Sequence, residues 1–551
     1  MTNIVVIIRI CLKMENPELF RRYLTGFEPA QVTYSTTDVL VIGSGAAGLI
    51  AAMEASRAGR VLIVSKDKLG ENNTMRAQGG VAAVLGREDS FESHINDTLE
   101  AGQGLCEPAV VEEVIKEGPR SIEALAGLGT CFDREDGQLA LTIEGGHSHP
   151  RVLHGKGDST GMVLEEALIN SIQKCDNINV LEHYFVIDML TVDGRCCGAI
   201  VWHRRKGKSV VWAKETILAT GGCGQLYRET TNSEIATGDG MAMAYRAGAT
   251  LQDLEFVQFH PTTLYIAGAA RSLATEALRG EGAILINKDG ERFMPKYHPM
   301  AELAPRDVVS RSILHEMRST EHTHVYLDVR HIPKDRLKAR FPGIWSTCSS
   351  FHMDISKEAI PVRPTAHYMI GGVKTDMKGR TDVEHLYACG ETVSTGLHGA
   401  NRLGSNSLLE CVVHGSRTGC EIADSLRRTS GDTRTHPINI EVKARRQRGL
   451  NLGDIRYALK SLMWRDVGLE RDERHLKDAI EELSHWSEYI MDKDFHSPYG
   501  WELQNMLLLS RLIACSARER KETRGVHYRR DFPDRNDREW KRHISVRRGD
   551  S

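Results

Sequence analysis

Apolar positions along residues 36–66 fall into two short runs on either side of an alanine-rich stretch, in TTDVLVIGSGAAGLIAAMEASRAGRVLIVSK. Short apolar runs bounded by turn residues are typical of buried strands, and an alanine-rich stretch between them is typical of a helix. The pattern therefore predicts a strand, a helix and a second strand, which is the repeating unit of an α/β fold with a parallel sheet.

A different period governs the C-terminal part of the chain. Leu476, Ile480, Leu483, Trp486 and Ile490 recur at spacings of 4, 3, 3 and 4 residues, which places them on one face of a helix. The segment WELQNMLLLSRLIACSARERKE, at residues 501–522, is a second long helical candidate. The polar run RRTSGDTRTHP before both predicts a domain boundary near residues 430–440.

Length and composition limit the protein class. A chain of 551 residues is too long for one ordinary core, so several domains are expected. The formal net charge of -3 gives no electrostatic footprint for nucleic acid, although a few local cations could still hold a small anion. The 12 cysteines include no CxxC pair, which favours reduced thiols in a cytoplasmic protein over disulfides or iron–sulfur clusters.

Residues 1–35 are expected to form an N-terminal extension. Their apolar run NIVVIIRICL is interrupted by Arg9, is too short to span a bilayer and lacks a small-residue cleavage site. No membrane association is therefore predicted.

Three glycines follow the first predicted strand with G-x-G-x-x-G spacing. Gly43 permits a tight turn, Gly45 lets a pyrophosphate approach the backbone, and Gly48 lets the helix pack closely on the strand. Between two strands and a helix, this spacing predicts dinucleotide binding. Lys66 stands roughly where an NAD-binding fold carries a ribose-binding acid, which weakens an NAD interpretation and leaves FAD open.

Further parts of such a fold lie far along the chain. KETILATGGCG and GRTDVEHLYACGE are strand-like runs that end in glycines, the second at Gly390 and Glu391. TGDGMAMAYRAGA places Asp239 between glycines before a predicted helix. A dinucleotide fold built from segments so widely separated implies an inserted domain.

The stretch LTIEGGHSHPRVLH, at residues 141–154, gathers a carboxylate and three histidines. Glu144, His147, His149 and His154 could be metal ligands, a substrate clamp or a hydrogen-bonded loop. No matching acid or cysteine cluster follows, so no metal site is predicted.

Several longer motifs are specific enough to indicate a family. They are NNTMRAQGGVAA, QFHPTTLY, TEALRGEGAILINKDGERFM, LAPRDVVSRSI, PTAHYMIGGV and GLHGANRLGSNSLLE. With these motifs the chain resembles the succinate dehydrogenase/fumarate reductase flavoprotein family from about Thr36 to about Pro533, and most closely its aspartate-oxidising members. The resemblance implies an α/β fold with a Rossmann-like FAD-binding domain in two segments (36–253 and 367–430), an inserted α+β capping domain (254–366) and a C-terminal helical domain (440–551).

The resemblance also implies a cofactor and a substrate site. Succinate dehydrogenases carry a histidine, covalently linked to FAD, where this chain has Asn73, so noncovalent FAD is expected. The implied substrate-binding residues are His260, Thr275, His367 and Arg402, with Arg306 and Glu144 as catalytic residues. The implied FAD contacts are Gly43, Ser44, Gly45, Ala46, Ala47, Gly48, Lys66, Asn73, Thr74, Gln78, Gly79, Gly80, Asp239, Glu391, Ser407 and Leu408.

The implied reaction is oxidation of L-aspartate to iminosuccinate, with O₂ or fumarate as electron acceptor. It would be the first step of NAD synthesis, with quinolinate synthase as the next enzyme. Glu144 fits aspartate because its carboxylate could bind the ammonium group that succinate lacks. Arg306 could accept a proton or only orient the substrate, and His398 could be either structural or functional. The alternatives are a soluble fumarate reductase or succinate dehydrogenase flavoprotein, or an electron-transfer subunit of a membrane complex.

Overall fold

The computed structural model describes residues 20–28, 32–266, 272–429, 431–442, 445–446 and 450–549. Residues 1–19 and 29–31 of the predicted extension lie outside the described residues. Residues 20–28 pack onto the core, because Phe20, Leu24 and Phe27 are buried and Phe27 pairs with Ile440. None of the helices described is both long and apolar enough to cross a membrane.

The largest sheet begins as the apolar pattern predicts. Strand β1 (Thr33–Ile42) is followed by helix α1 (Ala46–Ala55) and strand β2 (Val61–Val64), and β1 and β2 are parallel. The sheet has the order β8-β2-β1-β11-β10-β9, with β18 added beside β11. The remaining strands are β8 (Ile178–Leu181), β9 (Tyr184–Val192), β10 (Arg195–His203), β11 (Gly207–Leu218) and β18 (Leu386–Ala388).

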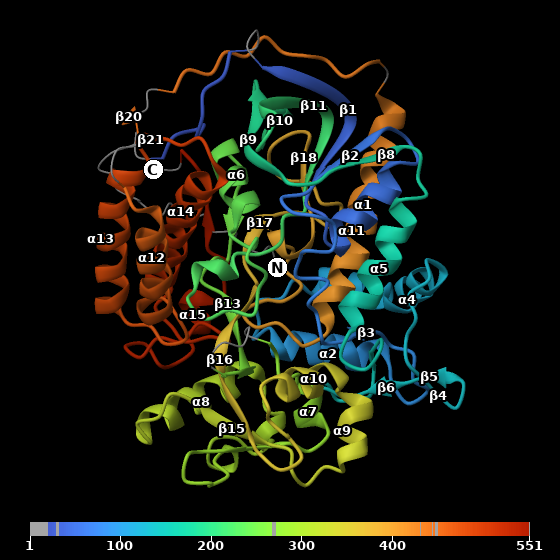
Figure 1. Ribbon diagram of the computed structural model, residues 1–551, viewed down its shortest axis with the longest axis vertical. Coiled ribbons are helices and arrows are strands. Elements are labelled where there is room, and N and C mark those ends of the chain that lie inside the picture. The colour runs from blue at the N-terminus through green and yellow to red at the C-terminus, as the bar shows by residue number, and fades with distance from the viewer. Residues whose placement is uncertain are drawn as a thin grey trace.

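Helices α1, α5 (Thr160–Ile172) and α11 (Asn406–Arg428) lie beside this sheet (Figure 1). Helix α11 can approach α1 closely because it places glycines at the contact. A Cβ on Gly415 would lie 2.7 Å from the Ala47 oxygen, and one on Gly419 would lie 2.5 Å from the Ala51 oxygen. The late segment around β18 and α11 therefore belongs structurally with the first strands of the chain.

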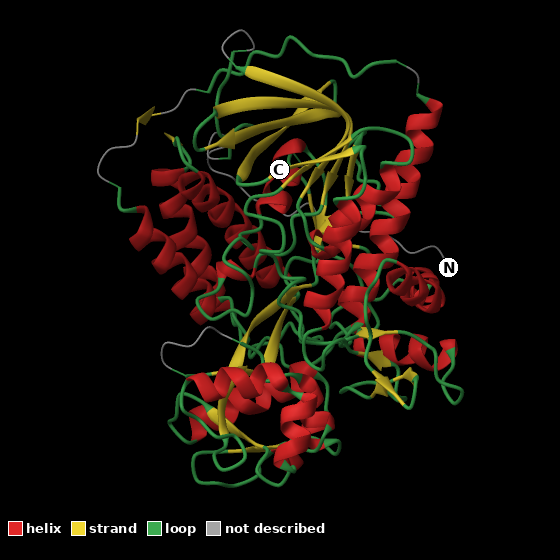
Figure 2. Ribbon diagram, turned by 45° about the vertical axis from the view of Figure 1, so that its right-hand side comes forward, coloured by secondary structure: helices red, strands yellow, loops and turns green. Residues whose placement is uncertain are grey.

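A second sheet forms the core of the part drawn at the bottom of Figures 1 and 2. Its strands run antiparallel in the order β13 (Val257–Leu264), β16 (Ile360–Met369), β15 (Val325–Asp328) and β14 (Ile284–Ile286). Helices α7 (Glu276–Gly280), α8 (Arg306–Ser319), α9 (Lys334–Arg340) and α10 (Pro342–Ser350) surround these strands. This part has its own apolar core.

The C-terminal part is helical, with α12 (Leu452–Asp466), α13 (Glu473–Ile490) and α14 (Pro498–Glu519). The predicted helix face is confirmed, because Leu476, Leu483 and Ile490 are fully buried and Ile480 and Trp486 pack against the same core. The chain then returns to the rest of the molecule, where β22 (Ser545–Val546) pairs with β12 (Leu251–Gln252).

The predicted fold class is thus confirmed: an α/β unit from two separated segments, an inserted α+β unit and terminal helices. The exact domain boundaries stay a prediction. Between the first two units, small strands β3 (Val81–Ala82), β6 (Leu141–Thr142) and β7 (Val152–Leu153) frame the loop that carries Glu144.

Candidate functional site

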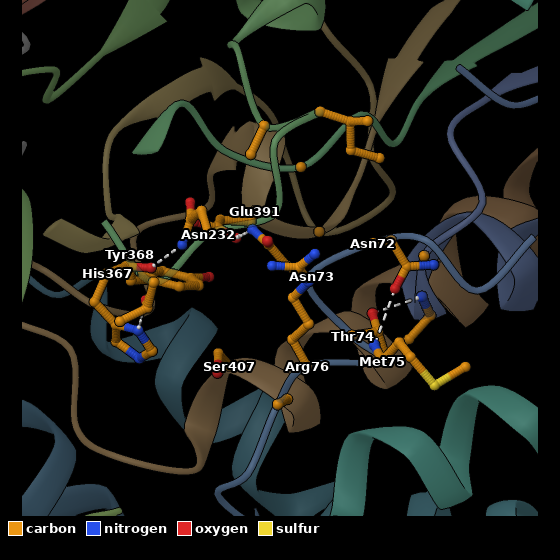
Figure 3. Close-up of a pocket in the computed structure, with 18 of the residues that line it drawn as sticks. Asn72, Asn73, Thr74, Met75, Arg76, Asn232, His367, Tyr368, Glu391 and Ser407 are labelled. Atoms are coloured by element: carbon orange, nitrogen blue, oxygen red, sulfur yellow. Dashed lines mark hydrogen bonds between the residues drawn. The ribbon is translucent and has the colours of Figure 1, made fainter. Parts of the chain in front are cut away.

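A cavity of about 790 Å³ lies where the large sheet, the second sheet and helix α12 meet. Its volume falls in the range of roughly 300–1,000 Å³ that is usual for ligand sites. Every residue predicted to bind FAD or substrate lines it except Gly48. Figure 3 shows part of the wall around Asn73, Glu391 and His367.

The glycine loop shapes one end of the cavity. Gly43 has a φ of +113°, and a Cβ there would lie 2.1 Å from the Ala219 oxygen, so only glycine fits. Gly48 lies behind the loop, because its Cβ would be 2.4 Å from the Gly43 oxygen. At Gly45 an added Cβ would approach only the Thr74 hydroxyl, at 3.3 Å, so the loop and the N-terminus of α1 face the cavity.

Two features of this wall fit the FAD that the resemblance implies. The N-terminus of α1 lines the cavity, where helix backbone N–H groups can bind a pyrophosphate, although the Ala46 N–H donates to the Thr74 hydroxyl at 3.1 Å. The Gln78 oxygen Oε1 is buried without a hydrogen-bond partner in the structure. A buried acceptor of this kind needs a donor, and the ring N–H of a flavin is a suitable one.

Lys66, which stands roughly where an NAD-binding fold carries a ribose-binding acid, pairs with two carboxylates. Its Nζ lies 2.8 Å from Asp239 Oδ2 and also pairs with Glu502 of α14. Burial lowers the pKa of Lys66, but Asp239 and Glu502 outweigh burial and raise it. The ammonium therefore stays charged, and the helical part of the chain helps to hold this end of the cavity.

Asn73 is fixed in the wall by two contacts. Its Oδ1 accepts a hydrogen bond from the Ser233 backbone N–H at 2.8 Å, and its Nδ2 lies 3.4 Å from Glu391 Oε2. Burial raises the pKa of Glu391 to about 7. An amide in this place cannot form a histidyl bond to FAD.

At the other end, three charged groups meet around Gly404. Glu276 begins α7 and Arg306 begins α8, and Arg306 Nε donates to Glu276 Oε2 at 2.7 Å. A Cβ on Gly404 would lie 3.1 Å from Arg306 Nη2 and 3.2 Å from Glu276 Oε2. It would also lie 3.1 Å from Glu144 Oε2, so the two carboxylates and the guanidinium lie close together around this glycine.

The two carboxylates have different electrostatic environments. Burial raises the pKa of Glu276, but Arg306 and then Arg279 outweigh burial and lower it. For Glu144, burial and then repulsion from Glu276 raise the pKa, and Arg306 only partly opposes them. Glu144 Oε2 accepts a hydrogen bond from the Ser405 hydroxyl at 2.8 Å, whereas its Oε1 is buried without a partner in the structure.

The Arg402 guanidinium is held by one hydrogen bond and one aromatic ring. Its Nε donates to Gln258 Oε1 at 3.1 Å, and its Cζ lies 4.1 Å from the centre of the Tyr368 ring. Burial and then Arg306 lower the pKa of Arg402 to about 10, so it remains protonated at neutral pH. Its rigid setting suits a bidentate contact with a carboxylate.

His260 and His367 are neighbours in the cavity wall, with ring centroids 5.2 Å apart. Burial followed by Arg306 holds the pKa of His260 well below its usual value, and burial followed by Arg402 does the same for His367. Both rings are therefore neutral. They contribute hydrogen bonds rather than charge.

The histidines near Glu144 do not gather into one site. His147 bonds the Gly404 carbonyl, His149 bonds Ser93 and Ser148, and His154 bonds Thr142. In the described part of the chain, no group of three or more potential ligands could hold a metal.

The motif TEALRGEG supplies Glu276, to which no role was assigned from the sequence. Neither Gln258 nor Tyr368 was predicted, although each lies within two positions of a predicted residue on its strand. Gln258 precedes His260 by two positions on β13, a spacing that puts both side chains on one face, so strand periodicity could have found it. His398 does not line the cavity; it bonds Glu410, which also accepts a hydrogen bond from Tyr368.

Comparison with known proteins agrees with this geometry. A family described as FAD binding domain matches residues 38–408, and one described as fumarate reductase flavoprotein C-term matches residues 456–551. The chain is 41% identical to an L-aspartate oxidase of Streptomyces coelicolor, over 94% of this chain and 93% of that protein. It is 41% identical to a chloroplastic L-aspartate oxidase of Arabidopsis thaliana, over 90% and 81% of the two chains.

Among solved structures, a mutant quinol fumarate reductase of E. coli superposes with a TM-score of 0.86 at 33% identity, covering 93% of this chain and 94% of that one. The cofactor of this chain is FAD, which the glycine loop and the matching FAD-binding family both indicate.

Because Asn73 stands where a histidyl link would form, we expect acid precipitation of the purified protein to release yellow FAD into the supernatant. Absorbance of the supernatant and of the redissolved pellet measures the two fractions. Flavin that stays with the pellet would contradict noncovalent binding.

Gly45→Val should yield mostly apoprotein. The added side chain would project into the cavity where the pyrophosphate is expected, while only the Thr74 hydroxyl lies near its Cβ, so the fold should survive. The measurement is the flavin-to-protein absorbance ratio, with Gly127→Val as control because nothing lies within 4 Å of a Cβ there. Full FAD occupancy in Gly45→Val would mean that the loop does not bind the cofactor.

Proposed function

The chain belongs to the L-aspartate oxidase family, a branch of the succinate dehydrogenase/fumarate reductase flavoproteins, and we propose that it oxidises L-aspartate to iminosuccinate. The observation that carries the proposal is Glu144. It is a buried carboxylate beside Arg306, and one of its oxygens has no partner.

An ammonium group would complete this arrangement. Buried Glu144 is destabilised as an anion by burial and by Glu276, and a cation beside Oε1 would favour its ionised form. A charge-assisted hydrogen bond of this kind contributes about 1.5–3 kcal/mol. Succinate has no amine, so it could place only its own negatively charged carboxylates near Glu144 and Glu276.

The carboxylates of aspartate need cationic and hydrogen-bonding partners. Arg402 supplies a charged, rigid guanidinium, and His260 and His367 supply neutral hydrogen-bonding rings on the same wall. The Thr275 hydroxyl also lines the cavity as the N-cap of α7. We assign these four residues to substrate binding.

Arg306 and Glu144 act nearest the reacting carbon in this proposal. When bound, FAD accepts the hydride removed from Cα. The amine must lose a proton for the imine to form, and Glu144 Oε1 is placed to take it, because a carboxyl with a raised pKa holds a proton well. Arg306, whose plane is fixed by Glu276, orients the substrate and neutralises charge rather than acting as the base.

The wider setting follows from the same assignment. O₂ or fumarate would accept the electrons, and iminosuccinate would pass to quinolinate synthase in NAD synthesis. We place the reaction in the cytoplasm, although several plant relatives are named as chloroplastic. The alternative, a fumarate reductase or succinate dehydrogenase flavoprotein, shares the fold but gives Glu144 no role.

Lysine should not replace the two arginines well, because it lacks the planar fork. Arg402→Lys also loses its stacking on Tyr368 and should mainly raise KM, whereas Arg306→Lys should mainly lower kcat, each by roughly ten- to a hundredfold. Steady-state kinetics with aspartate measures both effects. Arg336→Lys, at an exposed position, is the control. Near-normal kinetics in Arg402→Lys and Arg306→Lys would show that these two arginines do not act in the active site.

Glu144→Gln keeps size and shape but removes the charge. We expect kcat/KM for aspartate to fall by about ten- to a hundredfold, the scale of one charge-assisted hydrogen bond. Fumarate reduction by the same variant should be unchanged or faster, because a repulsive charge is gone. The ratio of the two activities is therefore the diagnostic quantity.

Exposed Glu135→Gln controls for preparation effects. An equal loss of both activities in Glu144→Gln would instead indicate that Glu144 only supports its loop, and would reopen the choice between the two functions.

A further inference from the structure

A buried acid lies next to the FAD site without lining the cavity. Glu165 is on helix α5, and its side chain is fully buried. Neither the substrate chemistry nor the cofactor contacts assigned above use it. Its one hydrogen-bond partner in the described part of the chain is Asn72, which does line the cavity.

Asn72 links helix α5 to the glycine loop. Its Nδ2 donates to Glu165 Oε1 at 2.6 Å and to the Ser44 carbonyl of the glycine loop at 3.1 Å. Its Oδ1 accepts from the Met75 backbone N–H at 3.0 Å, a contact drawn in Figure 3. The amide can make all three bonds only in one orientation, and Glu165 Oε1 holds its donor side.

Among the residues that the structure describes, no cation pairs with Glu165. Its second oxygen, Oε2, is buried without a partner in the structure, and burial raises the pKa to about 8 although Asn72 opposes the shift. The titratable groups on the neighbouring elements make other pairs, and none of them shifts this pKa. They are Glu54 of α1 with Arg57, Lys66 with Asp239, Lys68 with Glu71, Glu166 with Lys156, and the exposed Arg76.

We propose that Glu165 is a positioning residue of the FAD site, whose neutral carboxyl holds Asn72 and, through it, the Ser44 carbonyl of the glycine loop. The proposal rests on FAD binding and not on the identity of the substrate.

A dependence of FAD affinity on pH follows. FAD brings the negative charges of its pyrophosphate to the glycine loop, so bound FAD disfavours ionisation of Glu165. By linkage, ionisation of Glu165 must weaken FAD binding equally. The neutral form predominates below the pKa of the carboxyl, so the affinity is kept there and falls as the pH rises through it.

The experiment dilutes holoenzyme at a series of pH values from about 6.5 to about 9.5 and measures released FAD by its fluorescence. For the unaltered chain, the dissociation constant should rise by up to about tenfold per pH unit above about pH 8. Glu165→Gln keeps the acceptor and cannot ionise, so its curve should be flatter. Glu165→Leu loses the acceptor and should release FAD more readily at every pH.

Glu166→Gln, one residue along the same helix and half exposed, is the matched control and should follow the unaltered chain. Thermal unfolding of each variant provides a separate readout. Because the pKa of Glu165 in the folded chain is raised, the unaltered chain should lose stability as the pH rises from the ordinary carboxyl range to about 8, and Glu165→Gln should lose less. Parallel FAD-release curves for the unaltered chain and Glu165→Gln, or unchanged FAD retention in Glu165→Leu, would overturn the proposal.

Discussion

Two buried carboxylates, Glu144 and Glu276, lie close to the guanidinium of Arg306, and the binding properties of the cavity depend on this arrangement. Glu276 pairs with both Arg306 and Arg279. Two like charges in a dry site are unfavourable unless a cation lies between or beside them. Arg306 is committed to Glu276 by a short contact, so Glu144 is left undercompensated. This undercompensated charge favours a substrate that carries a cationic group.

The fold brings these charges together from different units. Glu276 and Arg306 each begin a helix of the inserted unit, whereas Glu144 lies in a loop framed by small strands beside the large sheet. The loop that carries Glu144 can approach Glu276 this closely because position 145 is a glycine. A Cβ on Gly145 would lie 2.6 Å from Glu276 Oε1. Further contacts tie the units together, such as the bond from Arg311 to the Gly525 carbonyl.

Much of this could be predicted from the sequence, because the strongest signals are local. The glycine loop and the helix face of α13 depend on residues a few positions apart, and the structure confirms both elements. The pairings of Lys66 with Glu502 and of Arg402 with Gln258 join residues far apart in the chain. No local pattern signals such contacts. The sequence around Glu165 also gives no sign that this helical glutamate is buried with no cation near it among the described residues.

If the undercompensated Glu144 carboxylate selects an amino dicarboxylate, the purified FAD-loaded chain should discriminate sharply between L-aspartate and succinate in air. With the two substrates assayed side by side for hydrogen peroxide, we expect sustained turnover of aspartate and little or none of succinate at equal concentration. Equal turnover of both substrates, or a preference for succinate, would contradict this selection.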